Sequence, residues 1–388
     1  MDVRAILMVG RTQPGPEENI AGIPIAYLDV LGLPLVERVW QRLRHFGVCG
    51  ATLISAAAPE AESFARRTRL RADMPWIQAP PGEFWQTAEN TFSKYAEEGA
   101  ELVIAVRVGP YAEVDYEELI QHHLDHHCPV TMAVDPAGAS LDIFVLNASR
   151  RNDAASLFRS ELRKLRTECK GFRVAGYVNR LKTAADLRRL ALDGLLRRNS
   201  IAPVGTETRP GVWIAESARI HRKARVLAPA FIGEYARIRT SALITRSAVV
   251  EHHAEIDCGT VVEDSTVLPY TYVGAGLDVM HSVVGFRRLS HLARNVDVEI
   301  SDRKLVGMSA VSVVSRLAGS TAALLAFLPK QIYRGFPAPH GEHTADVPES
   351  LEQQAAALKT PATEAQGPVP EASEFPSNLA VVRRYGEQ

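Results

Sequence analysis

Four histidines in one short stretch have the spacing of metal ligands. In "HHLDHHC", His122 stands four residues before His126, and His123 stands four residues before His127. Residues four apart lie on one face of a helix, so each pair could chelate a zinc ion. Histidines near the carboxyl end of a helix also interact favourably with the helix dipole. We favour this second interpretation, a polar helix end without a metal.

A second pair, His252 and His253, lies in "EHHAEIDCG". A neutral imidazole can take a proton from a hydroxyl or an amine, so either residue could serve as a general base. Outward positions of a regular coil are normally polar, and we favour that plainer interpretation. The general-base hypothesis stays as an alternative.

Up to about residue 195 the elements that must position such residues alternate between strands and helices. Apolar runs predict strands over 3–9, 49–56, 101–108, 129–136 and 141–147, and amphipathic runs predict helices over 34–47, 84–99, 115–127 and 184–199. This order is typical of a mostly parallel sheet with helices on both faces. In such α/β folds a ligand binds beyond the carboxyl ends of the strands.

A linker is predicted at 199–210, and beyond it apolar residues recur every six positions. The column comprises Ile214, Ile220, Val226, Ile232, Ile238, Ile244, Val250, Ile256, Val262 and Leu268. Two places earlier stand small residues, first alanines from Ala218 to Ala254 and then Thr260 and Thr266. Residues two apart share one face of a strand, so both columns should point inward. This period predicts a parallel β-helix over 211–285, with three short strands in each coil.

The chain ends in an apolar segment and a polar tail. We expect 286–336 to be helical and to cap the β-helix or to form an oligomer contact. Arg316 and Pro329 bound an apolar run that is too short to span a membrane. A basic flank keeps membrane contact through 305–329 open as an alternative. Residues 337–388, rich in Pro, Ala, Glu and Gln, predict a disordered tail.

Composition excludes several classes of protein. The 388 residues are 46% hydrophobic, and 44 Lys and Arg nearly balance 45 Asp and Glu. A net charge of -1 predicts no overall field that would attract nucleic acid or an anionic membrane. Four widely spaced cysteines suggest neither a zinc site nor a disulfide framework, and no export leader precedes the first strand. We therefore expect a cytoplasmic protein.

Several stretches, taken in order, resemble sugar-1-phosphate nucleotidyltransferases of the mannose-1-phosphate guanylyltransferase or glucose-1-phosphate type. They are "VRAILMVG", "YLDVLGLPLVERVWQRLRHFGV", "VDYEELIQHHLDHHCPVTMAV", "LDIFVLN" and "GYVNRLKTAADL", within 1–275. The resemblance implies a Rossmann-like nucleotidyltransferase domain over 1–198, followed by a left-handed β-helix of hexapeptide repeats. It also implies a nucleotide sugar or nucleoside triphosphate as ligand and a homo-oligomer, with no nucleic acid.

In that family a glycine-rich loop, a lysine and an arginine bind the phosphates, and aspartates hold Mg²⁺. This chain retains Gly10, Arg11 and Thr12 as a remnant of the loop. Ile25 stands where the resemblance places the lysine. The two metal aspartates are replaced as well. Without them the chain lacks the anchors that a hard cation requires.

Gly109 and Arg180 occupy the positions of the two metal aspartates, and Glu113 or Asp115 are alternative ligands if the alignment is shifted. Our first hypothesis is therefore a non-catalytic member that binds a nucleotide sugar or a partner enzyme in surface-polysaccharide synthesis. The second is an active Mg²⁺-dependent nucleotidyltransferase with relocated ligands. The third is a hexapeptide acyltransferase that uses His252 or His253 as its base.

Overall fold

The computed structural model describes residues 1–10, 19–56, 74–148, 171–285 and 287–309. All of them lie in a single compact unit of the chain. The predicted Arg11, Thr12 and tail, and the apolar segment from residue 310 on, lie outside these ranges.

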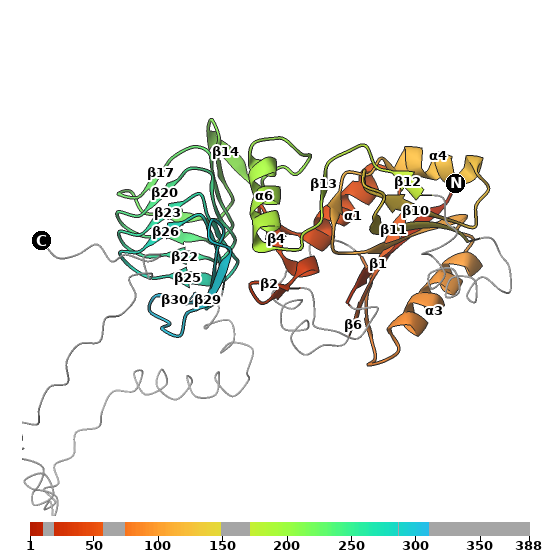
Figure 1. Ribbon diagram of the computed structural model, residues 1–388, viewed down its shortest axis with the longest axis horizontal. Helices are drawn as coiled ribbons and strands as arrows, with labels where there is room; N and C mark the ends of the chain where they lie inside the picture. Colours follow the sequence, from red (N-terminus) through yellow and green to blue (C-terminus); the bar gives the residue numbers. More distant parts are fainter. Residues whose placement is uncertain (11–18, 57–73, 149–170, 286, 310–388) are drawn as a thin grey trace, which may run out of the picture. The chain divides into compact units, whose positions relative to one another are not determined.

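A seven-stranded sheet forms the first part of the unit (Figure 1). Its order is β12 (Gly171–Arg173), β10 (Val130–Val134), β11 (Ser140–Asn147), β8 (Leu102–Arg107), β1 (Val3–Val9), β6 (Gly50–Ala56) and β7 (Trp76–Ala79). Only β11 runs antiparallel to its neighbours in this sheet. The five predicted strands are present. β7 and β12 were not predicted, because neither contains a run of apolar residues: β12 has only three residues, and β7 is largely exposed.

Four helices pack against this region, all close to their predicted ranges. They are α1 (Leu35–His45), α3 (Phe84–Glu97), α4 (Tyr116–Asp125) and α6 (Ala184–Leu195). Alternate residues of β1 point to opposite faces: Ile6 and Met8 share a core with α3, whereas Leu7 and Val9 share a core with the other three helices. The sheet is therefore covered on both faces, as its apolar strands require.

Short elements connect these strands and helices. They are β2 (Asn19–Ile20), β3 (Ile23–Pro24), the 3₁₀ helix η1 (Ile25–Tyr27), β4 (Asp29–Val30), β5 (Leu33–Pro34), β9 (Tyr111–Ala112) and β13 (Val178–Asn179). Between β4 and β5, Leu31 and Gly32 both have positive φ, at 54° and 93°. Two such residues make the tight hairpin turn whose twist suits antiparallel strands.

The second part, which we call the coil column (residues 212–285), stacks short parallel strands in three sheets (Figure 1). Its strands are β15 (Val212–Ile214), β16 (Arg219–Ile220), β17 (Arg225–Val226), β18 (Ala230–Ile232), β19 (Arg237–Ile238), β20 (Leu243–Thr245), β21 (Ala248–Val250), β22 (Glu255–Ile256), β23 (Val261–Glu263), β24 (Thr266–Val267), β25 (Thr271–Val273), β26 (Asp278–Met280) and β27 (Ser282–Gly285). Each strand pairs with the strand one coil later, as a β-helix does.

Residues eighteen apart are stacked through the third coil, and then the repeat shortens. Ile220 pairs with Ile238, and Ile238 with Ile256, as the period of six predicts. Val250, however, pairs with Val267, which is seventeen residues later. The prediction that Leu268 continues the inward column was therefore wrong. Val267 fills the column, and Leu268 joins the core that contains the α/β helices.

Antiparallel strands, and not helices, cover the far end of the column in the part that the structure describes. β28 (Arg288–His291) and β29 (Val296–Glu299) extend the sheet of β27, and β30 (Val306–Met308) pairs with β25. They use backbone groups that the last coil would otherwise leave unpaired. Before the column, β14 (Thr206–Arg209) lies within the predicted linker and pairs with β15.

One sheet of the column is apolar on both faces. In β18 and β21, Ile232 and Val250 point into the column, whereas Phe231 and Val249 belong to the same core as Leu28 and Leu187 of the α/β region. Consecutive apolar residues such as "AFI" and "AVV" follow from this double burial.

Candidate functional site

One edge of the seven-stranded sheet collects the carboxyl ends of its parallel strands. β1, β6, β7 and β8 run in one direction, and β11 runs opposite to both β8 and β10, so β10 also ends there. Gly10 follows β1, Arg107 ends β8, Asp135 follows β10, and Asp142 lies near the start of β11. Together with Arg180 we call these residues the sheet-edge site. Ligands of open α/β sheets bind at such an edge.

Arg107 and Asp142 form the first ion pair of this site. Nε of Arg107 lies 3.1 Å from Oδ2 of Asp142, and both side chains are half-buried. Asp142 has a φ of 57°, which is uncommon for a residue within a strand. The β10–β11 register is irregular next to it, between Met132 and Val134. Such irregularities re-aim side chains and are frequent beside functional sites.

Arg180 and Asp135 form the second ion pair. Nη2 and Nε of Arg180 lie 2.6 and 3.2 Å from Oδ2 of Asp135, while Oδ1 accepts a hydrogen bond from the backbone N–H of Ala139 at 2.8 Å. The hydrogen bond from Arg180 lowers the pKa of Asp135, and the backbone hydrogen bond acts in the same direction. The carboxylate is therefore held ionised by its neighbours.

The loop that carries Arg180 is fixed by its neighbours on both sides. Asn179 Oδ1 accepts from the N–H of Leu181 at 2.9 Å, and its Nδ2 donates to the carbonyl of Asp186 at 2.8 Å. Thr183 and Asp186 then form a reciprocal capping box that starts α6. Arg180 thus sits on a preset backbone and not on a free loop.

The positions at which the resemblance places phosphate and metal ligands have three different surroundings. Ile25 is buried in the hydrophobic core. Gly10 has a φ of 133°, and a Cβ there would lie 2.8 Å from the Cβ of Ala56, so only glycine fits. Gly109 is buried, yet a Cβ at this position would meet no atom within 4 Å. The sheet edge therefore has room for a side chain at residue 109.

The sheet-edge site does not fit Mg²⁺ as it stands. Its two carboxylates, Asp135 and Asp142, each face an arginine, and no carboxylate stands at residue 109 or 180. Within the described ranges no group of three His, Cys, Asp or Glu side chains is arranged to hold a metal. A hard divalent cation requires several oxygen ligands and is repelled by guanidinium groups.

The alternative metal ligands, Glu113 and Asp115, have other partners. Oε1 of Glu113 accepts hydrogen bonds from the backbone N–H of Ser200 and, at 3.5 Å, from the hydroxyl of Tyr111. Asp115 is the N-cap of α4, where it accepts from the N–H of Glu118 at 3.0 Å. An N-cap aspartate stabilises the helix start.

Three of the four histidines in and after α4 contact other groups of the protein. His123 is buried, with Nδ1 2.8 Å from the hydroxyl of Thr131 and Nε2 3.2 Å from Oδ1 of Asn147. Burial lowers the pKa of His123, so the imidazole is neutral. His122 and His126 stack with ring centroids 4.1 Å apart, and Nδ1 of His126 lies near the carbonyl of His122.

His252 and His253 lie where the coil column meets the α/β region. Nε2 of His252 lies 2.9 Å from Oδ2 of the buried Asp29, and its Nδ1 lies 3.0 Å from Nδ1 of His253. Both ring nitrogens of His252 are therefore engaged. Burial lowers the pKa of His252, but the charge and hydrogen bond of Asp29 outweigh it, so the net shift is upward. This geometry favours an ion pair over a free general base.

Glu251, the neighbour of His252, binds the β4–β5 turn. Its two carboxylate oxygens accept hydrogen bonds from the backbone N–H groups of Leu31 and Gly32, at 2.8 and 2.9 Å. The side chain is fully buried. Burial and the charge of Asp29 raise the pKa of Glu251 to about 8. The β4–β5 turn, which lies in the stretch "YLDVLGLPLVERVWQRLRHFGV", is therefore held by the coil column.

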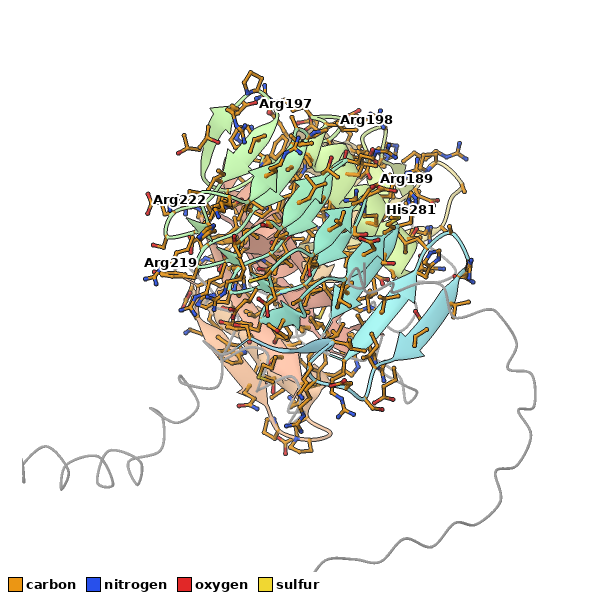
Figure 2. All side chains as sticks on the ribbon, turned by 90° about the vertical axis from the view of Figure 1, so that its left-hand side faces the viewer. Arg189, Arg197, Arg198, Arg219, Arg222 and His281 are labelled. Carbon is orange, nitrogen blue, oxygen red and sulfur yellow. The ribbon has the colours of Figure 1, made fainter. Side chains whose placement is uncertain are left out.

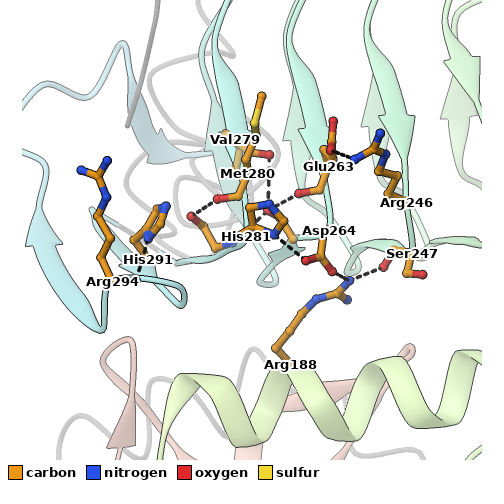
Figure 3. Close-up of polar contacts among 12 residues, drawn as sticks. Arg188, Arg246, Ser247, Glu263, Asp264, Val279, Met280, His281, His291 and Arg294 are labelled. Carbon is orange, nitrogen blue, oxygen red and sulfur yellow. Dashed lines mark hydrogen bonds and ion pairs between the residues drawn. The ribbon is translucent and has the colours of Figure 1, made fainter. Parts of the chain in front are cut away.

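Arg188 makes a second contact of this kind, from α6 (Figure 3). Its Nη2 donates to the carbonyl of Ser247 and to Oδ1 of Asp264, both at 2.8 Å, and Oδ2 of Asp264 lies 2.6 Å from Nδ1 of His281. Asp264 lies in the turn between β23 and β24, which by the strand register is one residue shorter than the corresponding turn between β20 and β21.

Sequence reasoning missed Arg107, Asp135, Asp142, Asp29 and Glu251. Arg107 and Asp135 had a usable signal, because both stand at the ends of predicted strands that should share one sheet edge. Asp29 and Glu251 are 222 residues apart in the chain, and no local pattern connects them.

Comparisons with known proteins add little to this geometry. No protein-family model and no curated protein matches the chain. A solved structure, described as the crystal structure of HddC from Yersinia pseudotuberculosis, is similar with a TM-score of 0.37 and 14% sequence identity. That match covers 48% of this chain and 97% of HddC.

None of the helices in the described ranges is long and apolar enough to cross a bilayer.

Proposed function

We propose that this protein is a non-catalytic relative of the sugar-1-phosphate nucleotidyltransferases that binds a nucleotide sugar at the sheet-edge site. Its role would be that of a binding or scaffold protein in nucleotide-sugar and surface-polysaccharide metabolism. The proposal includes a cytoplasmic location, a left-handed hexapeptide β-helix for the coil column, and a homo-oligomer.

The observation that carries the proposal is the pairing of Arg107 with Asp142 and of Arg180 with Asp135. In the enzymes that the chain resembles, aspartates at this edge hold Mg²⁺, and the metal neutralises the phosphates. Here the edge carries guanidinium groups, and its carboxylates are already bound to them. Phosphoryl or nucleotidyl transfer depends on that charge neutralisation, and these four residues do not supply it.

The same residues can still bind a phosphate. A guanidinium presents a planar fork of N–H donors that matches two phosphate oxygens. Arg107 and Arg180 are about one-third exposed, so a ligand can reach them. We therefore expect binding of the diphosphate group without a metal.

Calorimetric titration tests this proposal. The full-length protein is titrated with GTP, UTP, dTTP and the corresponding mannose and glucose nucleotides, each with and without Mg²⁺. We expect a nucleotide sugar to bind equally well in both conditions. Arg180→Ala should weaken that binding at least about tenfold, the loss expected for a charged hydrogen bond. Arg44→Ala, at an exposed arginine at the end of α1 and near the opposite edge of the sheet, is the matched control and should leave it unchanged.

Three results would contradict the proposal. Mg²⁺-dependent binding of a triphosphate followed by pyrophosphate release would establish an active nucleotidyltransferase. Consumption of a coenzyme A thioester that His252→Ala abolishes would establish an acyltransferase. No binding of any nucleotide would leave only the scaffold role.

A further inference from the structure

Charge is unevenly distributed along the coil column. Residues 211–246, its first two coils, contain seven Lys and Arg and two Glu, whereas 247–285 contain six acidic residues and no Lys or Arg. Arg239 and Arg246 each pair with a glutamate of the next coil, Glu255 and Glu263. The acidic residues therefore compensate only the charges nearest to them, and the start of the column stays basic.

Five residues make up what we call the basic corner: Arg219, Arg222, Lys223, Arg225 and Arg237. The first four are exposed, and Figure 2 shows Arg219 and Arg222 on the same side of the column, projecting outward. None of the five has a side-chain ion pair with another described residue. Arg219 and Arg237 even face each other in register on β16 and β19. Like charges in directly opposite positions destabilise a sheet. On its other side Arg237 lies opposite Glu255 of β22, which is already paired with Arg239.

The basic corner lies on the first two coils, and the apolar interior of the first coil is partly open. Of the inward residues of the first coil, Ile214, Ala218, Ile220 and Ala224 are only half-buried, whereas Val226 and, one coil later, Ile238 are buried. β16 and β17 are edge strands, and no described strand pairs with their outer sides, although Arg209 of β14 donates to the carbonyl of Val226 at 2.9 Å. Leu227, at the end of β17, is 40% exposed. The opposite end of the column is covered by β28, β29 and β30.

We propose that the start of the column binds the surface of an anionic lipid bilayer. Peripheral membrane binding combines basic side chains, which contact anionic headgroups, with apolar groups that enter the interface. The basic corner and the half-buried first coil with Leu227 supply these two components side by side. The surface is independent of the sheet-edge site, so this inference does not depend on the proposed function.

Two other occupants fit the surface less well. A second copy docked end to end would bring two basic corners together and be repelled. An added strand from an acidic protein would pair with β16 or β17, but each offers only two residues, so the pairing would supply few backbone hydrogen bonds. A bilayer needs no such pairing, because headgroups and water can satisfy the edge.

Co-sedimentation of the full-length protein with vesicles tests the proposal. Vesicles of phosphatidylcholine alone are compared with vesicles of phosphatidylcholine and phosphatidylglycerol, at low and at high salt. Each basic residue close to an anionic surface should strengthen binding about fivefold. Arg222→Glu combined with Lys223→Glu should therefore weaken binding at least about 25-fold. Arg288→Glu combined with Arg294→Glu changes the net charge equally at the opposite end and should have little effect.

Each outcome decides the question. Binding that requires phosphatidylglycerol, falls with salt and is lost in the Arg222/Lys223 variant supports the proposal. Equal binding to both kinds of vesicle overturns the proposal. Binding that the Arg222/Lys223 variant retains also overturns it, and would assign membrane contact to another part of the chain such as 305–329. Equal loss in both double variants also overturns it, because only net charge would then matter. Circular dichroism of all variants checks that these exposed substitutions leave the fold intact.

Discussion

His252 of the coil column and Asp29 of the α/β region are joined by an ion pair, with Nε2 and Oδ2 2.9 Å apart. Beside it, Glu251 accepts both backbone N–H groups of the Leu31–Gly32 turn. Leu31 adopts a left-handed conformation that a leucine disfavours, so the turn depends on these hydrogen bonds. The column thus stabilises the local backbone of the first region.

Glu251→Ala should lower the free energy of unfolding by about 2–4 kcal/mol, because two buried backbone donors lose their acceptors. Denaturation by urea measures the change. Glu216→Ala, at an exposed glutamate of the first coil, is the matched control and should change stability by less than about 0.5 kcal/mol. Equal effects of the two substitutions would contradict the role of Glu251.

The free energy of unfolding should fall as pH rises from about 6 to about 8.5, by about 2 kcal/mol. Glu251 has a pKa of about 8 when folded and about 4.3 when unfolded, so between these values only the folded state holds its proton. The raised pKa of His252 acts in the same direction above its unfolded value of about 6.5. Urea denaturation across this range is the measurement. Glu251→Gln should flatten the profile, and a rise in stability with pH would contradict this account.

Arg188→Ala should lower the free energy of unfolding by about 2 kcal/mol. It removes a buried guanidinium, so the carbonyl of Ser247 and the carboxylate of Asp264 lose their donor. Asp264 is 37% exposed and keeps His281, which limits the loss. Thermal denaturation monitored by circular dichroism measures it. Arg189→Ala, the next residue of α6 with a side chain 77% exposed, is the control. If both variants melt alike, the contact in Figure 3 contributes nothing to stability.

Gly109→Asp combined with Arg180→Asp should create a Mg²⁺ site at the sheet edge. A side chain at residue 109 has free space, and removing the guanidinium leaves Asp135 without its partner. Three carboxylates would then be available at one edge. Calorimetry with MgCl₂ measures the change. Gly109→Asp combined with Arg44→Asp, which lies at the opposite edge of the sheet, keeps Arg180 and should not bind the metal, and binding by this control would refute the role assigned to Arg180.

The sequence predicted the elements well wherever periodicity carried the information. β1 spans Val3–Val9 as expected, and α1, α3, α4 and α6 fall within or close to their predicted ranges. The six-residue period likewise predicted stacked parallel strands. These patterns succeed because burial of one face imposes a local repeat.

Prediction failed where distant contacts decide. The shortened turn at Asp264 makes Val250 stack on Val267 and not on residue 268. This change is not visible in the sequence, because residue 268 is itself an apolar leucine. Residues 288–308 were expected to be helical, but they form strands. They do so because they pair with the edges of the last coil, and such distant pairing leaves no local pattern in the sequence. The net charge of -1 likewise concealed the basic corner, because a sum over the chain contains no positions.

The sheet of β18 and β21 has a consequence for how the protein unfolds. Its outward residues, Phe231 and Val249, lie in the same apolar core as the α/β helices, so the boundary expected at 199–210 separates sequence patterns but not cores. Calorimetric heating should therefore give one endotherm for both regions, with equal calorimetric and van't Hoff enthalpies. Fragments cut at that boundary would each expose half of a core and associate or aggregate on their own.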